Sequence, residues 1–459
     1  MTTARSHRRL ARTAAVLIAA TVAGAAMPAA EAKPPKGDTA RISEGPKGER
    51  LDGNSSALGL STDGRSALFS STATNLLPGT GTPNSDEVYV RNLRNGHLER
   101  VSVADDGSRL NAPTTTASIS GDGRYVAFST TATNVVPGQP AHASDVFVRD
   151  RWTGHTELVT AAALPGTGDQ SAADALSPSI SGNGRYVAYV SDRTDLAPGV
   201  DTHGRRNVYV ADRWTHTSRL VTVGADGQAA DRESLDPAIS ADGSTVAFTS
   251  KARNLLPAAP AGPDPGDGTP GLASGPRSYP TYVWTAGTGT ITGASLNEAG
   301  ELEGSRAGRI SPDGRYAVYS LAEDAAGMPG HGGARWDLYV HELATGKVTP
   351  VNPEVSGKAP KGHTIGGVMT ADSRWVYFDS GIDFLVPGDT NSAPDVFRRD
   401  LWTGRIERVS LTRDGGQSTT SSLDPFVDAS GDTVIFDGGN GNLVPGEPND
   451  FQDVFLRRP

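Results

Sequence analysis

The chain of 459 residues contains no cysteine, 55 glycines and 31 prolines, and its formal net charge is −10. The lack of cysteine excludes a disulfide-stabilised fold, and the acidic balance excludes the basic surface that nucleic-acid binding requires. Frequent Gly and Pro without long helix-forming runs predict many short strands joined by tight turns. We therefore expect an all-β protein.

Residues 1–32 have the pattern of a secretory signal peptide. A positive region with Arg5, Arg8, Arg9 and Arg12 precedes a short apolar stretch over 14–26, and Ala30-Glu31-Ala32 fits a cleavage site. The apolar stretch is too short for a membrane span, and no second one follows. We expect a secreted or extracytoplasmic protein without a membrane span, with a leader at 33–38 and one domain over 39–459.

One phrase recurs along the whole of that domain. Ser120-Gly-Asp-Gly-Arg-Tyr-Val-Ala-Phe-Ser129 has counterparts whose turn positions fall at 64, 123, 184, 243, 314, 373 and 431. Successive turns are 58 to 61 residues apart, except for the 71 residues that separate 243 from 314. A repeat of this length indicates an array of identical supersecondary units.

Each unit contains four predicted strands. In the second unit they cover 117–120, 125–129, 145–149 and 156–160, with an Asp-Gly turn after the first and a Trp-Thr-Gly turn after the third. Four-stranded sheets at a fixed period are typical of propeller blades. The sequence predicts a seven-bladed β-propeller, with six blades as the alternative.

The two ends of the domain are predicted to complete one blade. The chain finishes on a third strand, Asp453-Val-Phe-Leu-Arg457, so the seventh unit lacks its fourth. Thr39-Ala-Arg-Ile-Ser43 is similar to the fourth strand that ends Glu407-Arg-Val-Ser410. We expect the N-terminal strand to close the ring; a frayed leader is the alternative.

The phrases Ser-x-Asp-Gly-Arg-x-Val-Ala-Phe-Ser and Asp-Val-Phe-Val-Arg-Asp resemble the propeller repeats of TolB-like proteins, in a secreted actinobacterial type of sequence. The resemblance covers residues 39–459 and implies the propeller fold. It implies no activity, because propellers carry many unrelated functions. The separate N-terminal domain of TolB has no counterpart here.

Catalytic motifs are missing from the sequence. There is no Gly-x-Ser-x-Gly, no His-Glu-x-x-His, and no room after the propeller for an appended hydrolase domain. First-strand positions are mostly Ala, Ser, Ile and Gly. Arg309 and Asp428 are the charged residues near first-strand turns, and an acidic pocket at the axis would favour an enzyme.

Loops between second and third strands vary more than the turns on the opposite face, and variable loops on a rigid scaffold often carry recognition. The fourth unit has a Pro/Gly-rich insertion at about 258–280. It is either a plain surface loop or a lid or binding loop whose candidate residues are Asp264, Asp267, Arg277 and Tyr279.

Two loops repeat an acidic spacing that suits a structural Ca²⁺ ion. Oxygen ligands occur at positions 1, 3 and 7 in Asp389, Asn391 and Asp395, and again in Glu447, Asn449 and Asp453. The alternative is that Asp145, Asp395 and Asp453 cap the start of the third strands.

The leading interpretation is an exported, non-catalytic binding or scaffold propeller that presents variable loops to a protein, peptide or polysaccharide. The rival is an exported hydrolase or lyase with a site in the central cleft. No nucleic-acid partner is expected, and we expect a monomer.

Overall fold

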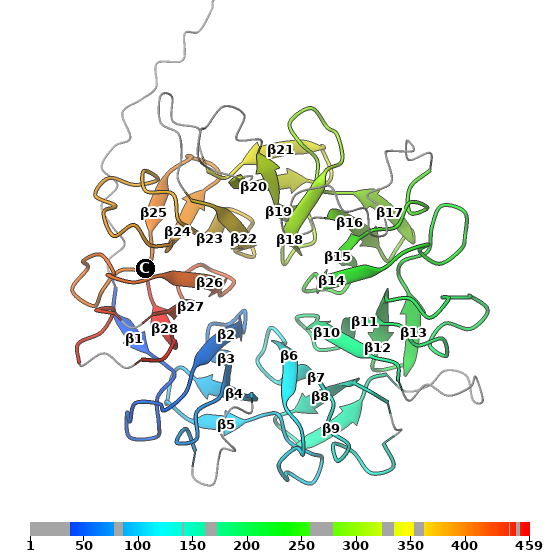
Figure 1. Cartoon of the computed structure of the whole chain (residues 1–459), viewed down its shortest axis with the longest axis horizontal. Coiled ribbons are helices and arrows are strands. Elements are labelled where there is room, and N and C mark those ends of the chain that lie inside the picture. The colour runs from blue at the N-terminus through cyan, green and yellow to red at the C-terminus, as the bar shows by residue number, and fades with distance from the viewer. Residues whose placement is uncertain are drawn as a thin grey trace, which may run out of the picture. The chain divides into compact units, whose positions relative to one another are not determined.

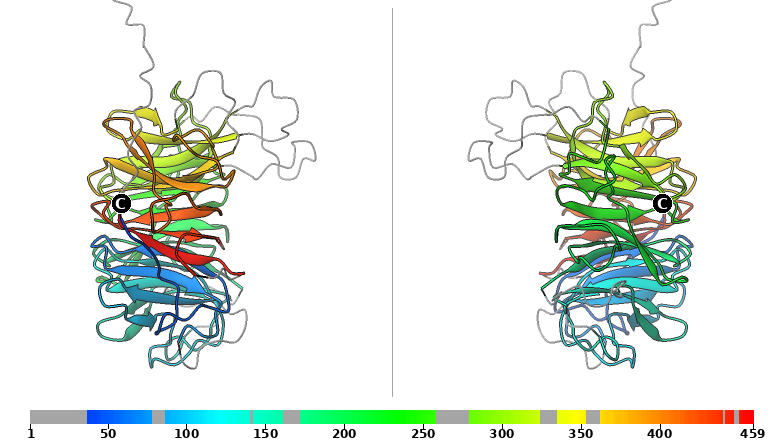
Figure 2. Two further views of the ribbon diagram at one scale, coloured as in Figure 1. Left: turned by 90° about the vertical axis from the view of Figure 1, so that its left-hand side faces the viewer. Right: turned by 90° about the vertical axis from the view of Figure 1, so that its right-hand side faces the viewer.

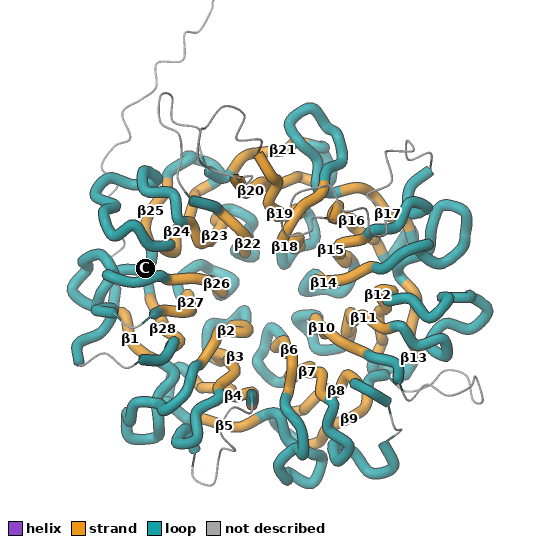
Figure 3. Tube along the Cα trace, viewed as in Figure 1, coloured by secondary structure: helices purple, strands orange, loops and turns teal. Residues whose placement is uncertain are grey.

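A computed structural model describes residues 37–77, 86–139, 142–160, 172–257, 279–323, 335–352, 362–439, 441–446 and 450–459. Regular structure in this part of the chain consists of strands alone (Figure 3). No helix among these residues is long and apolar enough to cross a bilayer. The all-β prediction is confirmed.

The strands fall into seven units, numbered here 1 to 7 from the first sequence repeat. Their bounds are as follows: β2 (Ser55–Leu60), β3 (Ser66–Ser71), β4 (Glu87–Asn92) and β5 (Leu98–Arg100) in unit 1; β6 (Thr114–Ile119), β7 (Tyr125–Thr130), β8 (Asp145–Asp150) and β9 (His155–Leu158) in unit 2; β10 (Ala175–Ile180), β11 (Tyr186–Ser191), β12 (Asn207–Asp212) and β13 (Thr217–Leu220) in unit 3; β14 (Ser234–Ile239), β15 (Thr245–Ser250), β16 (Tyr279–Thr285) and β17 (Thr290–Gly293) in unit 4; β18 (Gly304–Ile310), β19 (Tyr316–Glu323), β20 (Arg335–Glu342) and β21 (Lys347–Pro350) in unit 5; β22 (Thr364–Met369), β23 (Trp375–Ser380), β24 (Asp395–Asp400) and β25 (Ile406–Arg408) in unit 6; and β26 (Ser422–Val427), β27 (Val434–Gly438) and β28 (Asp453–Arg457), with β1 (Thr39–Arg41), in unit 7.

Each unit is an antiparallel meander, and the meanders are arranged around a common centre with their first strands innermost (Figure 1). Five units are separate four-stranded sheets. Units 4 and 5 share one eight-stranded sheet, because Tyr279 and Pro280 of β16 pair with Ser305 and Gly304 of β18. The meander thus occurs seven times in six separate sheets, and the predicted propeller is confirmed.

The strands run from one face of the ring to the other (Figure 2), so the first-to-second and third-to-fourth turns share one face, named here the turn face. The opposite face, named the loop face, carries the second-to-third loops and the crossovers between units. In unit 2, the Ser120 hydroxyl donates to Asp122 and accepts the Tyr125 N–H. Gly123 closes this turn at φ +71°, a conformation that favours glycine.

The core lies between the sheets. Each unit stacks an aromatic ring of its second strand on one of its third, with centroids 5.6 to 6.2 Å apart, as in the pairs Phe128–Phe147 and Phe378–Phe397. Second and third strands are buried on both faces. A sheet of this kind is stable only between two neighbours, so an open ring would expose two apolar faces.

The N-terminal strand closes the ring as predicted. β1 pairs antiparallel with β28, matching Thr39 with Arg457 and Arg41 with Phe455. The Ser43 hydroxyl donates to Asp453 over 2.7 Å and accepts the Val454 N–H over 2.9 Å. In unit 6, Ser410 makes the same two bonds with Asp395 and Val396. Ser43 therefore takes the place that a fourth strand supplies in other units.

We expect Ser43→Ala to lower the free energy of unfolding by about 1–3 kcal/mol, because it removes the hydrogen bond that Ser43 donates to the buried Asp453 carboxylate and the one it accepts from the Val454 N–H. Urea denaturation of residues 33–459 measures the change. Lys47→Ala, an exposed substitution in the same segment, serves as the control and should have no effect. Equal stability of both variants would contradict the assigned role of the N-terminal strand.

Candidate functional site: the carboxylates at the propeller axis

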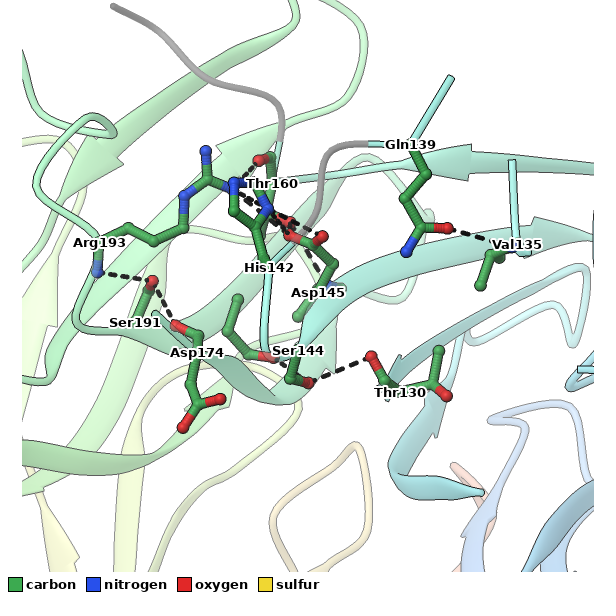
Figure 4. A network of polar contacts seen from close by, with 12 residues as sticks. Thr130, Val135, Gln139, His142, Ser144, Asp145, Thr160, Asp174, Ser191 and Arg193 are labelled. Carbon is green, nitrogen blue, oxygen red and sulfur yellow. Dashed lines mark hydrogen bonds and ion pairs between the residues drawn. The ribbon is translucent and has the colours of Figure 1, made fainter. Parts of the chain in front are cut away.

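The acidic residue that starts the third strand belongs to a repeated structural contact. In unit 2, Asp145 accepts a hydrogen bond from Thr160 over 2.8 Å and lies 3.0 Å from Nδ1 of His142 (Figure 4). The fully buried Arg193 of unit 3 approaches the same carboxylate at 3.4 Å. Burial raises the pKa of Asp145. This position is a buried, paired carboxylate that fastens the third strand to the fourth.

In unit 6, the residues predicted to bind Ca²⁺ come together around a guanidinium. Arg408 pairs with Asp389 at 3.1 Å and with Asp395 at 3.2 Å. The Asn391 amide donates to Asp395 over 3.2 Å. Burial raises the pKa of Asp395, ahead of the lowering effect of Ser410 and Arg408. No group of three or more His, Cys, Asp or Glu is placed to hold a metal ion within the described ranges.

The second predicted set is only partly described. Glu447 and Asn449 lie outside the described residues, whereas Asp453 starts β28 and pairs with Arg41 at 3.2 Å. The contacts of Asp145, Asp395 and Asp453 are those expected of caps at the start of third strands. The Ca²⁺ hypothesis stays a prediction.

The candidate binding loop of unit 4 also falls mostly outside the described residues, which do not include Asp264, Asp267 or Arg277. Tyr279 does not lie in a loop: it begins β16 and pairs with Ser305. Its ring lies 4.9 Å from the Lys251 ammonium. The expected insertion therefore ends before Tyr279.

A bulge in the innermost strand brings charged side chains to the axis. In units 3 to 7 the first strand changes register at a residue with positive φ, and this residue is Asp236 in β14 and Asp424 in β26, at φ of +52° and +50°. Both side chains are exposed. The bulge itself belongs to the fold, since Ser177, Ala307 and Gly366 share it. Among these five bulges, those of units 4 and 7 carry a carboxylate, that of Asp236 and that of Asp424.

Arg309 of β18 projects into the same region. Its side chain is exposed, yet desolvation lowers its pKa, while the charges of Asp424 and Asp236 raise it. No ion pair links Arg309 to another residue in the described part of the chain. Asp428, the other charged residue considered from the sequence, is buried and accepts the Gly431 and Asp432 N–H groups of its own turn. Of the two charged residues considered from the sequence, Arg309 therefore remains a candidate for the axial site and Asp428 does not.

Two further carboxylates depart from the repeat in adjacent units. The second-strand residue after the core aromatic is Ser, Thr or Val in units 1 to 5, but it is Asp379 in unit 6 and Asp437 in unit 7. Ser320 of unit 5 accepts the bulge N–H of Gly366 over 3.3 Å. Asp379 accepts the Asp424 N–H over 3.3 Å, and Asp437 accepts the Ala57 N–H over 2.6 Å. A hydroxyl suffices for this contact, so the fold does not require the two aspartates.

These carboxylates are held in an unfavourable environment for their charged form. Burial, reinforced by the charge of Asp424, raises the pKa of Asp379 to about 7. Burial likewise raises the pKa of Asp437 to about 8, although Ala57, Ser56 and Gln452 donate hydrogen bonds to it. Titratable groups shifted by desolvation and a like charge are characteristic of functional sites.

Asp379 also lines a pocket of about 490 Å³ on the loop face, together with His363, Asp383, Ser392 and Pro394. Nδ1 of His363 accepts the Trp336 N–H over 3.3 Å. The pocket therefore offers the carboxyl of Asp379 on β23 together with polar side chains of the loops that precede β22 and join β23 to β24. Asp379 connects this pocket to Asp424 at the axis.

No protein-family model matches the chain, and no curated protein matches it. Among solved structures, oligogalacturonate lyase from Vibrio parahaemolyticus is 13% identical, with a TM-score of 0.52 over 94% of this chain and 98% of that one. The β-propeller domain of the Trilobed protease from Pyrococcus furiosus is also 13% identical, with a TM-score of 0.51 over 89% and 94%. At these identities the likeness establishes the propeller fold alone.

TolB from Acinetobacter baumannii is among the neighbours, at 16% identity and a TM-score of 0.37 over 82% of this chain and 77% of that one. The TolB-like resemblance of the repeat phrases is thus accompanied by TolB among the structural neighbours. At this TM-score the match adds no weight to the fold, which rests on the meanders and the two structures above.

Arg408→Ala should lower the free energy of unfolding by about 3–5 kcal/mol, because it leaves two buried carboxylates without a countercharge. Thermal denaturation in chelator and in millimolar Ca²⁺ measures this loss and also tests the Ca²⁺ hypothesis. A stabilisation of wild type by Ca²⁺ would support a bound ion at these oxygens. An unchanged melting temperature for Arg408→Ala in chelator would contradict the structural role of the ion pair.

Protonation of Asp379 and Asp437 predicts a pH dependence of stability. Both pKa values lie above the ordinary 3.8, so between about pH 4 and pH 8 the folded state retains protons that the unfolded state has lost. Stability should therefore fall as pH rises through this window, by at most about 4 kcal/mol for Asp379 and about 6 kcal/mol for Asp437.

We expect the double variant Asp379→Ser/Asp437→Ser to be more stable than wild type at pH 8.5 and to gain less, or nothing, at pH 4.5. Chemical denaturation at the two pH values measures the difference. Asp106→Ser, at an exposed turn, is the control. A double variant whose stability follows the wild-type pH profile would contradict the assignment of protonated carboxyls.

Proposed function

We propose that this chain is an extracytoplasmic, non-catalytic binding propeller that takes a hydroxyl-rich, anionic segment of a polysaccharide at its axis. The observation that carries the proposal is the replacement of a repeated hydroxyl by Asp379 and Asp437 in two adjacent units, close to Asp424. Arg309, which forms no ion pair among the described residues, lies near enough to Asp424 to interact with its charge. The signal-peptide pattern of residues 1–32 supports export.

The chemistry of the four groups favours this ligand class. A protonated carboxyl both donates and accepts hydrogen bonds, which suits sugar hydroxyls. The Arg309 guanidinium, which has no ion-pair partner within the described ranges, suits a carboxylate, to which it can donate two parallel hydrogen bonds. A protein partner would need a far larger contact area than the pocket beside Asp379 provides.

The raised pKa of Asp379 favours one second candidate, acid–base catalysis on the same ligand. A carboxyl with a pKa of about 7 can hold a proton near neutral pH, and Asp379 lies close to a second carboxylate, that of Asp424. The acidic side chains of Asp379 and Asp424 near the axis also support this alternative, since the sequence analysis gave an acidic pocket there as a feature that would favour an enzyme. A hydrolase or lyase is therefore the alternative that the same experiment must separate from simple binding.

Oligogalacturonate is the first probe, because it carries both hydroxyl and carboxylate groups; a lyase named for this substrate shares the fold. We expect saturable binding by isothermal titration calorimetry at pH 6, weakened at least 10-fold by Arg309→Ala and by Asp379→Ser. Arg94→Ala, at an exposed turn on the turn face, should bind as wild type does.

Chromatography of the incubated probe distinguishes the two candidates. An intact probe supports binding alone, whereas shortened products that disappear with Asp379→Ser would support catalysis. Failure of the wild-type protein to bind the probe, or equal affinity in all three variants, would contradict the axial site.

A further inference from the structure

Three tryptophans stand exposed on the turn face. Trp152, Trp214 and Trp402 have 70%, 65% and 73% of their side-chain surface open to solvent. Each follows a third strand, in the turns β8–β9, β12–β13 and β24–β25. Each indole therefore presents a large, rigid apolar face to solvent.

A rigid set of contacts holds each indole in place. Asp150 accepts the Trp152 N–H over 3.0 Å and receives two hydrogen bonds from Arg124, over 2.9 and 2.6 Å. The Arg124 guanidinium lies 4.7 Å from the Trp152 ring and 4.7 Å from the Tyr125 ring. These hydrogen bonds hold the pKa of Asp150 at about 2, so its charge persists at all ordinary pH values.

Units 3 and 6 repeat the arrangement. Arg185 pairs with Asp212 and lies 4.6 Å from the Trp214 ring. Arg374 pairs with Asp400 and lies 4.7 Å from the Trp402 ring. In all three units the guanidinium covers one side of the indole while most of the ring surface stays open.

The turn does not need tryptophan. Arg94, Gly287 and Ala344 occupy the same position in units 1, 4 and 5. The turn hydrogen bond forms there too, for example from Gly289 N–H to Thr285 and from Gly346 N–H to Glu342, both over 2.8 Å. The turn therefore forms without an indole, and in units 2, 3 and 6 the indole covers the Arg–Asp ion pair with one face only.

The surroundings of the indoles select the class of partner. A protein interface requires a contiguous apolar centre that is poor in charge, whereas each of these rings is isolated among Arg and Asp side chains. A cation is disfavoured because a guanidinium already lies against each ring. The apolar C–H face of a sugar ring fits an isolated indole, and the adjoining charged and hydroxyl groups can bond its hydroxyls.

We propose that the turn face binds a polysaccharide chain by stacking sugar rings on Trp152, Trp214 and Trp402. This surface is separate from the axial site and does not depend on it. Trp152 and Trp214 belong to neighbouring units, so one chain contacts both. The strands β24 and β25, whose connecting turn contains Trp402, lie on the other side of the ring (Figure 1), and this indole forms a second contact. Because linked contacts reinforce one another, the loss of either member of the pair weakens retention more than the loss of Trp402.

The test measures depletion of the mature protein, residues 33–459, by suspensions of cellulose, chitin and peptidoglycan sacculi. We expect saturable binding to at least one of them. The triple variant Trp152→Ala/Trp214→Ala/Trp402→Ala should bind at least 10-fold more weakly, and Arg94→Ala should bind as wild type does. Asp379→Ser/Asp437→Ser should also retain binding, which separates this proposal from the axial one.

An unchanged melting temperature in the triple variant establishes that it is folded. No binding to any of the three polymers, or equal binding by the triple variant, would overturn the proposal. Sedimentation provides the remaining test: a wild-type dimer that the triple variant converts to a monomer would assign the indoles to self-association, and would also overturn it.

Discussion

The pairing of β1 with β28 is the interaction on which the rest of the molecule depends. Each meander buries both faces of its sheet against neighbours, so the array has no stable open form unless its two ends meet. Ser43 and Arg41 tie the N-terminal segment to Asp453, a contact that in other units comes from the chain that directly follows. The closed seam also builds the candidate site, because Asp437 of the last unit accepts the Ala57 N–H of the first.

A comparison of equivalent positions in the repeated units shows which residues the propeller scaffold needs and which it does not. The turn serines, the aromatic pairs and the capped third strands recur because every blade must form the same turns and bury the same sheet faces against its neighbours. Asp379 and Asp437 replace a hydroxyl that satisfies the same backbone donor elsewhere, and they do so at a cost in stability near neutral pH. The exposed indoles likewise add to a turn that forms without them. Residues that the fold tolerates but does not need are where function is expected.

Much of the fold could be predicted from sequence because its determinants are local and repeated. The recurring turn phrase, with Asp-Gly in units 1, 2, 4 and 5, predicted the first hairpin of the units, and the match of Thr39–Ser43 to Glu407–Ser410 predicted the closing strand. The axial carboxylates were missed because they depend on contacts between units. The phrase Ser-Leu-Asp-Pro occurs at 234–237 and again at 422–425, and it contains Asp236 and Asp424, but the phrase alone does not indicate what these residues contact in other units. A comparison of the aligned repeats could have found two of these carboxylates. The second-strand position that holds Ser320 in unit 5 holds Asp379 in unit 6 and Asp437 in unit 7, so an uncharged side chain is replaced there by an acidic one. The sequence marked Asp428 as a charged residue near the first-strand turn. In the structure its carboxylate takes the place that the turn serine has in other units, such as Ser120, and accepts N–H groups of its own turn.

The central claim is that Asp379 and Asp437 keep their protons in the closed ring up to near-neutral pH, with pKa values of about 7 and about 8. Infrared difference spectroscopy between wild type and Asp379→Ser/Asp437→Ser, recorded across a pH titration, tests it most directly. The account predicts a protonated carboxyl band at pH 6 in wild type that is absent from the variant and is lost with midpoints of about 7 and about 8. Loss of that band below pH 5 would contradict the account, since both carboxyls would then be ordinary surface acids.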